Sequence, residues 1–259
     1  MSIKSPQEII AVSCNAGCAK ADLSIEEELV LGFLAGAFIA LGGMLTVMGQ
    51  GGMDLNLPAF AFAGLGPLGI LLVVITGAEL FTINCVIMPP ACLVGAVHWQ
   101  KMLRNWLLVY LGNLLGALLA ALFLAYGTGI INVNASGSGA EAGAAAAMLA
   151  ERKVVLGWGA LLLRGVGCGW LIGLGVWLAF STDDLLGSLV GLWLPVVAFV
   201  VLGFEHGIAN VFFIPLGMIN GAAVGVFRFL FGNLLPVTLG NVIGAGFVGV
   251  LYWWLYART

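Results

Sequence analysis

Apolar residues dominate six stretches of this sequence, and polar or charged residues separate them. Four stretches are unbroken and cover about residues 29–48, 105–126, 154–180 and 233–254. Each reaches roughly the 20 residues that a helix needs to cross the bilayer core. The other two, about residues 59–98 and 189–218, each contain a polar interruption. The pattern therefore predicts an all-α membrane protein with six transmembrane segments, of which the second and fifth are broken.

The two interruptions have similar sequences. The first is Gly77–Asn84, GAELFTIN, and the second is Gly203–Asn210, GFEHGIAN. Glycine, glutamate and asparagine recur at the same offsets, and the two copies are 126 residues apart. Broken hydrophobic segments at matching positions of two halves are typical of transport sites near the middle of the membrane. We therefore expect a pore or a binding site where the two breaks meet.

A second repeat supports the division into halves. The stretch Asn105–Ala117 matches Asn233–Ala245, 128 residues further along. We expect repeat 1 to cover about residues 29–126 and repeat 2 about residues 154–256. Because each half holds three segments, the second half enters the membrane inverted relative to the first. Together the halves form a channel domain, residues 29–257.

Residues 1–28 are polar to amphipathic and end in three glutamates. We expect a cytoplasmic helical segment that lies at the membrane face or packs against a neighbouring subunit. It lacks the short apolar core and cleavage site of a signal peptide. Residues 127–150 form the longest connection and include 137–143, which we expect to be a flexible loop. Pro89 and Pro90 argue against a helix after the first break.

Composition confirms the membrane class and excludes others. Hydrophobic residues make up 62% of the chain and charged residues only 8%, whereas soluble proteins carry about 25% charge. The net charge of -3 with scattered lysines and arginines indicates no nucleic-acid partner. More basic residues fall on the side of the termini, which favours a multi-pass protein of the cytoplasmic membrane with both termini in the cytoplasm. These are Lys4, Lys20, Lys101, Arg104 and Arg258, against Arg152, Lys153 and Arg228 on the other side.

No motif in the sequence indicates an enzyme, a metal or a cofactor. Neither a zinc-binding H-E-x-x-H, a P-loop nor a nucleophile elbow is present. The five cysteines are odd in number, and three lie within apolar stretches, so we expect free thiols. Cys14 and Cys18 alone are too few ligands for a metal site.

His206 is the main candidate for chemistry. A histidine can serve to pack helices by bonding a carbonyl group. At the break of an apolar segment, we instead expect it to meet the permeating species, because its ordinary pKa of about 6.5 allows proton exchange near neutral pH.

The paired carboxylates Glu79 and Glu205 have two interpretations. They could relay protons, or they could brace the breaks by accepting hydrogen bonds from backbone amides freed there. The symmetric duplication favours the brace. We expect Asn84 and Asn210 to cap the helices that resume after each break. The amino ends of these helices carry partial positive charge, which favours an anion.

Two basic residues, one just before the fourth segment and one within it, need separate interpretations. Lys153 either extends from the helix end to water or attracts anions to a pore entrance. For Arg164, inside the segment, we expect pairing with carbonyl groups or a carboxylate of a neighbouring helix rather than contact with a substrate.

Several motifs together resemble those of the formate/nitrite transporter family. They span nearly the whole chain in the family's order: Gly77–Thr82, Arg164–Cys168 with Val176 and Trp177, Leu194–Phe199, Gly203–Asn210 with Phe212–Pro215, and Asn233–Asn241. The resemblance implies an aquaporin-like protomer and a homopentamer with one pore in each protomer. It also implies that the connection containing Lys153 is extracytoplasmic.

The same resemblance implies roles for individual residues. His206 corresponds to the central pore histidine, and Thr82 faces it from the first break, to which Leu80 and Phe81 also belong. The resemblance further implies an outer constriction at Phe199, an inner one at Ile70 and Ile172, and a vestibule lysine at Lys153. Two positions depart from the pattern, Gly66 and Gly169, and we expect both to line the pore.

These features predict a channel or transporter for a small monovalent weak-acid anion, and formate is the first candidate substrate. The anion would gain a proton near His206 and cross two apolar constrictions as the neutral acid. The sequence does not separate formate from nitrite or hydrosulfide, or a channel from a proton symporter. An aquaporin-type channel for neutral solutes is less favoured because the twin Asn-Pro-Ala signature is missing. A membrane-embedded redox subunit would need more paired histidines or cysteines than this chain has.

Overall fold

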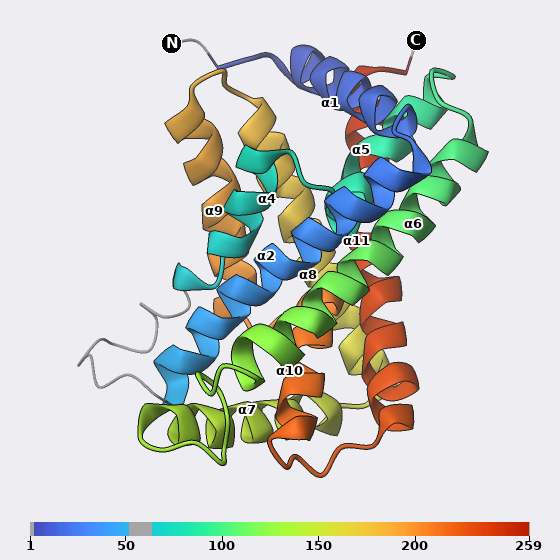
Figure 1. Cartoon of the computed structure of the whole chain (residues 1–259). Coiled ribbons are helices and arrows are strands. Elements are labelled where there is room, and N and C mark those ends of the chain that lie inside the picture. Colours follow the sequence, from blue (N-terminus) through green and yellow to red (C-terminus); the bar gives the residue numbers. More distant parts are fainter. Residues whose placement is uncertain (1–2, 52–63, 259) are drawn as a thin grey trace.

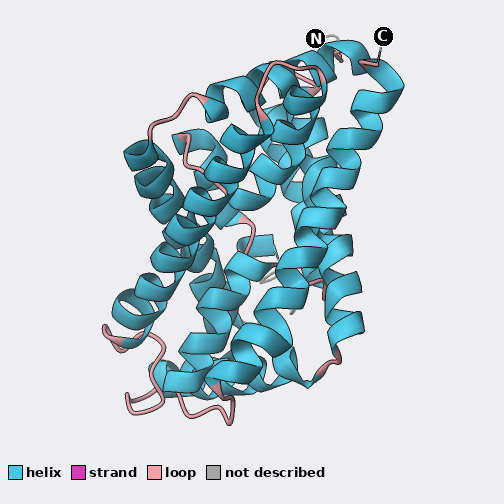
Figure 2. Ribbon diagram, turned by 90° about the vertical axis from the view of Figure 1, so that its right-hand side faces the viewer, coloured by secondary structure: helices cyan, strands magenta, loops and turns pink. Residues whose placement is uncertain are grey.

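The computed structural model describes residues 3–51 and 64–258, and in this part of the chain all regular structure is helical (Figures 1 and 2). The α-helices are α1 (Pro6–Ala21), α2 (Ile25–Gly51), α4 (Leu68–Thr76), α5 (Phe81–Leu93), α6 (Trp99–Leu119), α7 (Ser138–Val155), α8 (Trp158–Phe180), α9 (Leu185–Val201), α10 (Gly207–Ile219) and α11 (Leu235–Tyr256). Two π-helical segments, η1 (Ala120–Tyr126) and η2 (Arg228–Leu234), adjoin α6 and α11.

Four helices of the described chain are long and apolar enough to cross a membrane. They are α2, α6 with η1, α8, and η2 with α11. Helices α4 and α5 satisfy the same criteria as a pair and are bent by 51° relative to each other, so the break expected at Gly77–Asn84 is present. Helices α9 and α10 are shorter apolar helices on either side of the second break. The loop before the second segment and the start of that segment lie within residues 52–63, outside the described residues.

Two surface helices lie across opposite ends of the bundle. Helix α1 covers one end, and α7 covers the other (Figure 1). Each packs on a helix that follows a break, α1 on α5 and α7 on α10. Gly17 of α1 lies against Ala91 of α5, and Gly217 of α10 lies against Ala150 of α7. The two contacts are equivalent, because Ala91 and Gly217 are 126 residues apart.

Glycines set the close packing of the long helices. A Cβ atom at Gly36 of α2 would lie 2.1 Å from the Asn113 carbonyl oxygen of α6, and one at Gly169 of α8 would lie 2.3 Å from that of Asn241 of α11. Small residues let helix backbones approach this closely in a membrane, where dispersion contacts drive packing. The α2–α6 and α8–α11 pairs are thus equivalent, and Gly169 packs on α11 instead of lining a pore as we expected.

The repeat extends to the surface helices. The Asn105 side-chain amide donates to the Lys20 carbonyl of α1 at 3.4 Å, and that of Asn233 donates to the Lys153 carbonyl of α7 at 2.7 Å. Lys20 and Lys153 therefore occupy equivalent places at opposite ends of the molecule. By these contacts the repeats begin with α1 and α7, earlier than the predicted starts at residues 29 and 154.

Helix α1 begins at a capping box. The Ser5 hydroxyl accepts a hydrogen bond from the Glu8 backbone amide, and the Glu8 carboxylate accepts from the Ser5 amide and hydroxyl. The bonds from the Ser5 amide and then its hydroxyl hold the pKa of Glu8 below its ordinary value. The glutamates of residues 26–28, predicted to end the N-terminal segment, instead occupy the first turn of α2, where the helix dipole favours negative charge.

Three predictions about local structure were wrong. Residues 138–143 are not a flexible loop, because the alanine-rich sequence forms α7, consistent with the high helix propensity of alanine. Lys153 belongs to α7, and the fourth span begins only at Trp158. Helix α5 continues through Pro89 and Pro90. Pro90 leaves the Val86 carbonyl without its usual donor, and that carbonyl packs against Gly249 of α11.

Candidate functional site

The second break presents His206 at the start of α10. Gly203 has φ +68° after α9, and His206 is the N-cap of α10, with its Nδ1 accepting from the Ala209 amide at 3.3 Å. An accepting Nδ1 places the proton of the neutral ring on Nε2. Nε2 lies 3.2 Å from Thr82 Oγ1 of α5. The structure therefore brings together the two residues that were expected to face each other, and both are buried.

An asparagine side chain fixes the backbone on both sides of His206. Asn241 Oδ1 accepts from the Gly207 amide at 2.8 Å, and its Nδ2 donates to the Glu205 carbonyl at 2.9 Å. We call this arrangement the asparagine clamp. The same amide also donates to the Gly165 carbonyl of α8 at 2.9 Å, so the clamp joins three elements.

The first break has an equivalent clamp. Asn113 Oδ1 accepts from the Phe81 amide at 2.9 Å, and Nδ2 donates to the Glu79 carbonyl at 2.8 Å. The clamped residue here is Leu80, the counterpart of His206. Neither Asn113 nor Asn241 was among the predicted site residues. Their recurrence could have identified them, because the two asparagines occupy the same place in the repeat, 128 residues apart.

The clamps explain why the two carboxylates have different partners from those expected. Glu205 Oε2 accepts from Lys153 Nζ at 2.9 Å and from Asn210 Nδ2 at 2.7 Å. Asn210 thus lies in the first turn of α10 and binds Glu205 instead of capping the helix. The Phe81 and Gly207 amides have asparagine oxygens as acceptors, and the amides of Glu79 and Glu205 bond backbone carbonyls, so the two glutamate side chains bond other side chains instead.

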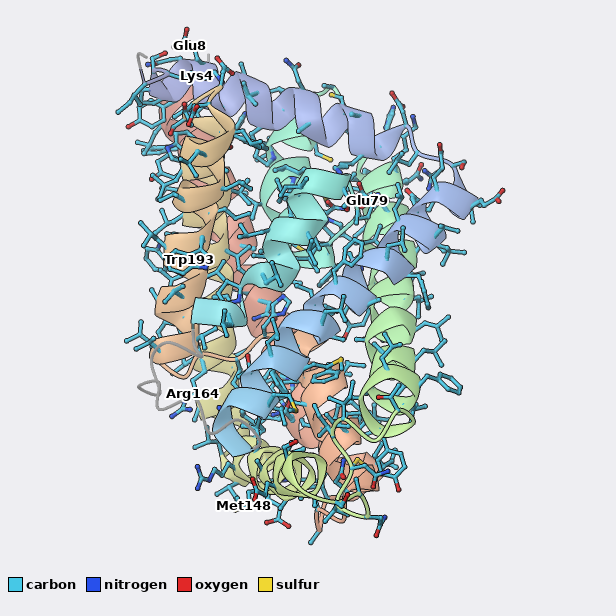
Figure 3. The ribbon with its side chains drawn as sticks, turned by 60° about the vertical axis from the view of Figure 1, so that its left-hand side comes forward. Lys4, Glu8, Glu79, Met148, Arg164 and Trp193 are labelled. Carbon is cyan, nitrogen blue, oxygen red and sulfur yellow. The ribbon has the colours of Figure 1, made fainter. Side chains whose placement is uncertain are left out.

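The first break repeats this network. Glu79 forms an ion pair with Lys20 and accepts from Asn84 Nδ2 at 2.8 Å. Asn84 likewise binds a glutamate and does not cap a helix. In Figure 3, Glu79 lies beneath α1, far from Arg164 toward the α7 end. Glu28, which bonds Asn105 at 3.2 Å, occurs only in the first half. At the clamped position the first break has Leu80 and the second has His206.

A cavity of about 280 Å³, which we call the vestibule, opens on the α7 side of His206. Seven predicted site residues line it: Ile70, Lys153, Ile172, Phe199, Glu205, His206 and Asn210. The phenyl ring of Phe199 lies 6.3 Å from the His206 ring, centroid to centroid. Gly66, expected in the pore, also lines the vestibule. Among the described residues, the wall carries the cationic side chains of Arg152, Lys153 and Arg164 and the carboxylate of Glu205.

The other predicted pore residues lie outside the vestibule wall. Thr82 reaches the site through its contact with His206, and Leu80 is buried at the first break. The ring of Phe81 packs edge-on against Tyr110, with 4.8 Å between centroids. Glu79 and Asn84 belong to the equivalent network at the α1 end.

Lys153 is held in place at the vestibule. Its side chain is 13% exposed, its Nζ bonds Glu205, and it lies 5.3 Å from the ring centroid of Phe213. Arg164 Nη1 donates to the Gly203 carbonyl at 3.1 Å, which confirms the predicted pairing with a carbonyl group. All five cysteines are unpaired.

Long apolar helices, a bent pair and a cationic vestibule that ends at a buried histidine define a helical membrane transport protein. A family model described as Formate/nitrite transporter matches residues 7–254, and the chain belongs to that family. It is 41% identical over 272 residues to the "Probable formate transporter" of Methanothermobacter thermautotrophicus, covering 99% of this chain and 98% of that protein.

Two solved structures are similar along most of their length. An "FNT family ion channel" superposes with a TM-score of 0.84 at 25% identity and covers 95% of this chain and 98% of its own. A "Pentameric formate channel with formate bound" gives a TM-score of 0.75 at 29% identity, with 90% and 98% covered. The family is one of transporters and channels, in agreement with a protein that is not an enzyme.

Proposed function

We propose that this protein conducts formate, or a closely similar weak-acid anion, past His206. The observation that carries the proposal is the position of His206 at the inner end of the vestibule, with Nδ1 occupied by the backbone and Nε2 directed to Thr82. A relative and a solved neighbour whose names refer to formate support the choice of substrate.

The vestibule charge suits an anion. Lys153, Arg152 and Arg164 raise the local concentration of anions by electrostatic attraction. The same cavity is also lined by apolar side chains such as Phe199, Ile70 and Ile172. Desolvating a bare charge there is far more costly than desolvating a neutral acid. Formate therefore takes up a proton that comes from water; where His206 passes on its Nε2 proton, the ring regains one from water and stays neutral, and formic acid crosses.

The assembly and orientation follow the same family likeness. We propose that α4 with α5, and α9 with α10, act as two broken spans, which gives six spans in two inverted halves. The neighbour described as a pentameric formate channel supports a homopentamer. The basic residues near the termini support a cytoplasmic-membrane protein with α1 at the cytoplasmic end and α7 outside.

Swelling of proteoliposomes tests this function. Vesicles that contain the protein should swell in isosmotic formate and nitrite, and the rate should rise as the pH falls because the neutral acid is the crossing species. Glycerol should give the rate of protein-free vesicles. Rapid swelling in glycerol would favour the aquaporin-type alternative, and swelling in nitrite or hydrosulfide but not in formate would identify a different anion.

A further inference from the structure

Arg164 of α8 contacts the second break with both its backbone and its side chain. Its carbonyl accepts from the Glu205 amide at 3.3 Å, and its Nη1 donates to the Gly203 carbonyl at 3.1 Å. The residue therefore brackets the turn that carries His206. Its half-buried side chain also lines the vestibule, on the same wall as Lys153.

The two cations differ in what they can offer an anion. Lys153 is a point charge already bonded to Glu205 and packed over Phe213. The guanidinium of Arg164 has five N–H donors in one plane, and the Gly203 carbonyl uses one group of them. A planar fork matches the two oxygens of a carboxylate in a bidentate pair, which an ammonium group cannot reproduce.

In addition to the pairing with a carbonyl group, and contrary to the expectation that it makes no contact with a substrate, we propose that Arg164 is a specificity-determining residue. It binds planar anions with two oxygens, the carboxylate and nitrite class, in the vestibule before they reach His206. Hydrosulfide has a single acceptor atom and gains only the charge of the guanidinium. This inference rests on the proposed function and narrows it, because it ranks formate and nitrite above hydrosulfide as substrates.

The test compares Arg164→Lys with wild type in proteoliposomes. Lysine keeps the charge and the capacity to bond Gly203 but lacks the fork. We expect the KM for formate and for nitrite to rise about tenfold, as for loss of one charge-assisted hydrogen bond. The inhibition constant of hydrosulfide against formate uptake should change less than about twofold. The readout is therefore the ratio of the KM for formate or nitrite to the inhibition constant of hydrosulfide.

Arg228→Lys is the matched control. Arg228 also bonds a backbone carbonyl, that of Val154, toward the same end of the molecule, but it is not among the residues of the vestibule wall. It should leave the ratio unchanged. If Arg164→Lys does not assemble, Arg164→Gln is measured in the same way and should shift the ratio in the same direction.

An equal change for all three anions, or no change, would overturn the inference, because it would leave Arg164 a general charge or a brace of the turn. Wild-type protein that carries none of these anions would instead defeat the proposed function. The two failures are thus distinguishable in one set of vesicles.

Discussion

His206→Phe is expected to lower formate flux by about 10- to 100-fold, because an interaction with a charged or proton-exchanging group worth about 1.5–3 kcal/mol is lost. The ring of phenylalanine can occupy the same place between Phe199 and Thr82, but it has no atom that can donate, accept or exchange a proton. The α10 cap at the Ala209 amide is lost as well. Uptake of labelled formate into proteoliposomes measures the change.

His206→Asn is the companion variant for this experiment. Asparagine is a good N-cap and can bond a hydroxyl, so it preserves the start of α10 but does not titrate. We expect it to retain more flux than the phenylalanine variant, with a weaker dependence on pH. Wild-type rates in the phenylalanine variant would show that the transport route does not pass this side chain.

Asn241→Leu is expected to give the second large effect, on stability and flux together. Leucine has the same branched side-chain skeleton as asparagine, although it is larger, and it leaves the Gly207 amide and the carbonyls of Glu205 and Gly165 without their partner. Each buried polar group left unsatisfied costs about 1–3 kcal/mol. Thermal unfolding in detergent should occur at a lower temperature, and formate flux should fall because the backbone around His206 is no longer fixed.

Two controls separate the local clamp from a general loss of stability. Asn113→Leu removes the equivalent clamp around Leu80 and should lower the unfolding temperature to a similar extent. Because Leu80 does not titrate, the pH dependence of the remaining flux should stay that of wild type. Ile243→Ala on the exposed face of α11 should change neither property. An Asn241→Leu protein with normal flux and stability would contradict the role of the clamp.

The repeat made much of this site predictable from sequence. The interruptions at Gly77–Asn84 and Gly203–Asn210 recur with one spacing, so their apposition and the contact of Thr82 with His206 could be expected. The partners of the glutamates could not. A carboxylate at a helix break can accept hydrogen bonds from backbone amides or from side chains. Which donors it binds depends on whether other acceptors lie closer to the amides. In the structure, Asn113 and Asn241 reach them.

The surface helices show a second limit of the sequence. Helix α7 is rich in alanine and glycine, a composition that also fits a loop, and helical propensity alone did not reveal that it packs on α10. Its equivalence to α1 emerges only from contacts, since Gly17 of α1 packs on Ala91 of α5 as Ala150 of α7 packs on Gly217 of α10. The sequence therefore located Lys153 near the pore but at the end of a connection, whereas it lies on α7.

Comparison of the two nearly symmetric breaks indicates the role of His206. Two equivalent networks of lysine, glutamate and asparagine hold the breaks, and the residue between the clamped peptide groups is leucine in one half and histidine in the other. A structural brace needs no titratable group, since Leu80 is held in the same way. The imidazole is thus the feature that the scaffold does not require, as expected for a residue that acts on the substrate.

The most direct test of the account is formate uptake into proteoliposomes under two separate driving forces. An imposed pH gradient, acid outside, should drive uptake, whereas a potassium diffusion potential set with valinomycin at equal pH should not change the rate, because the crossing species is neutral. Uptake that follows the membrane potential and ignores the pH gradient would show that the bare anion crosses, and would contradict protonation at His206.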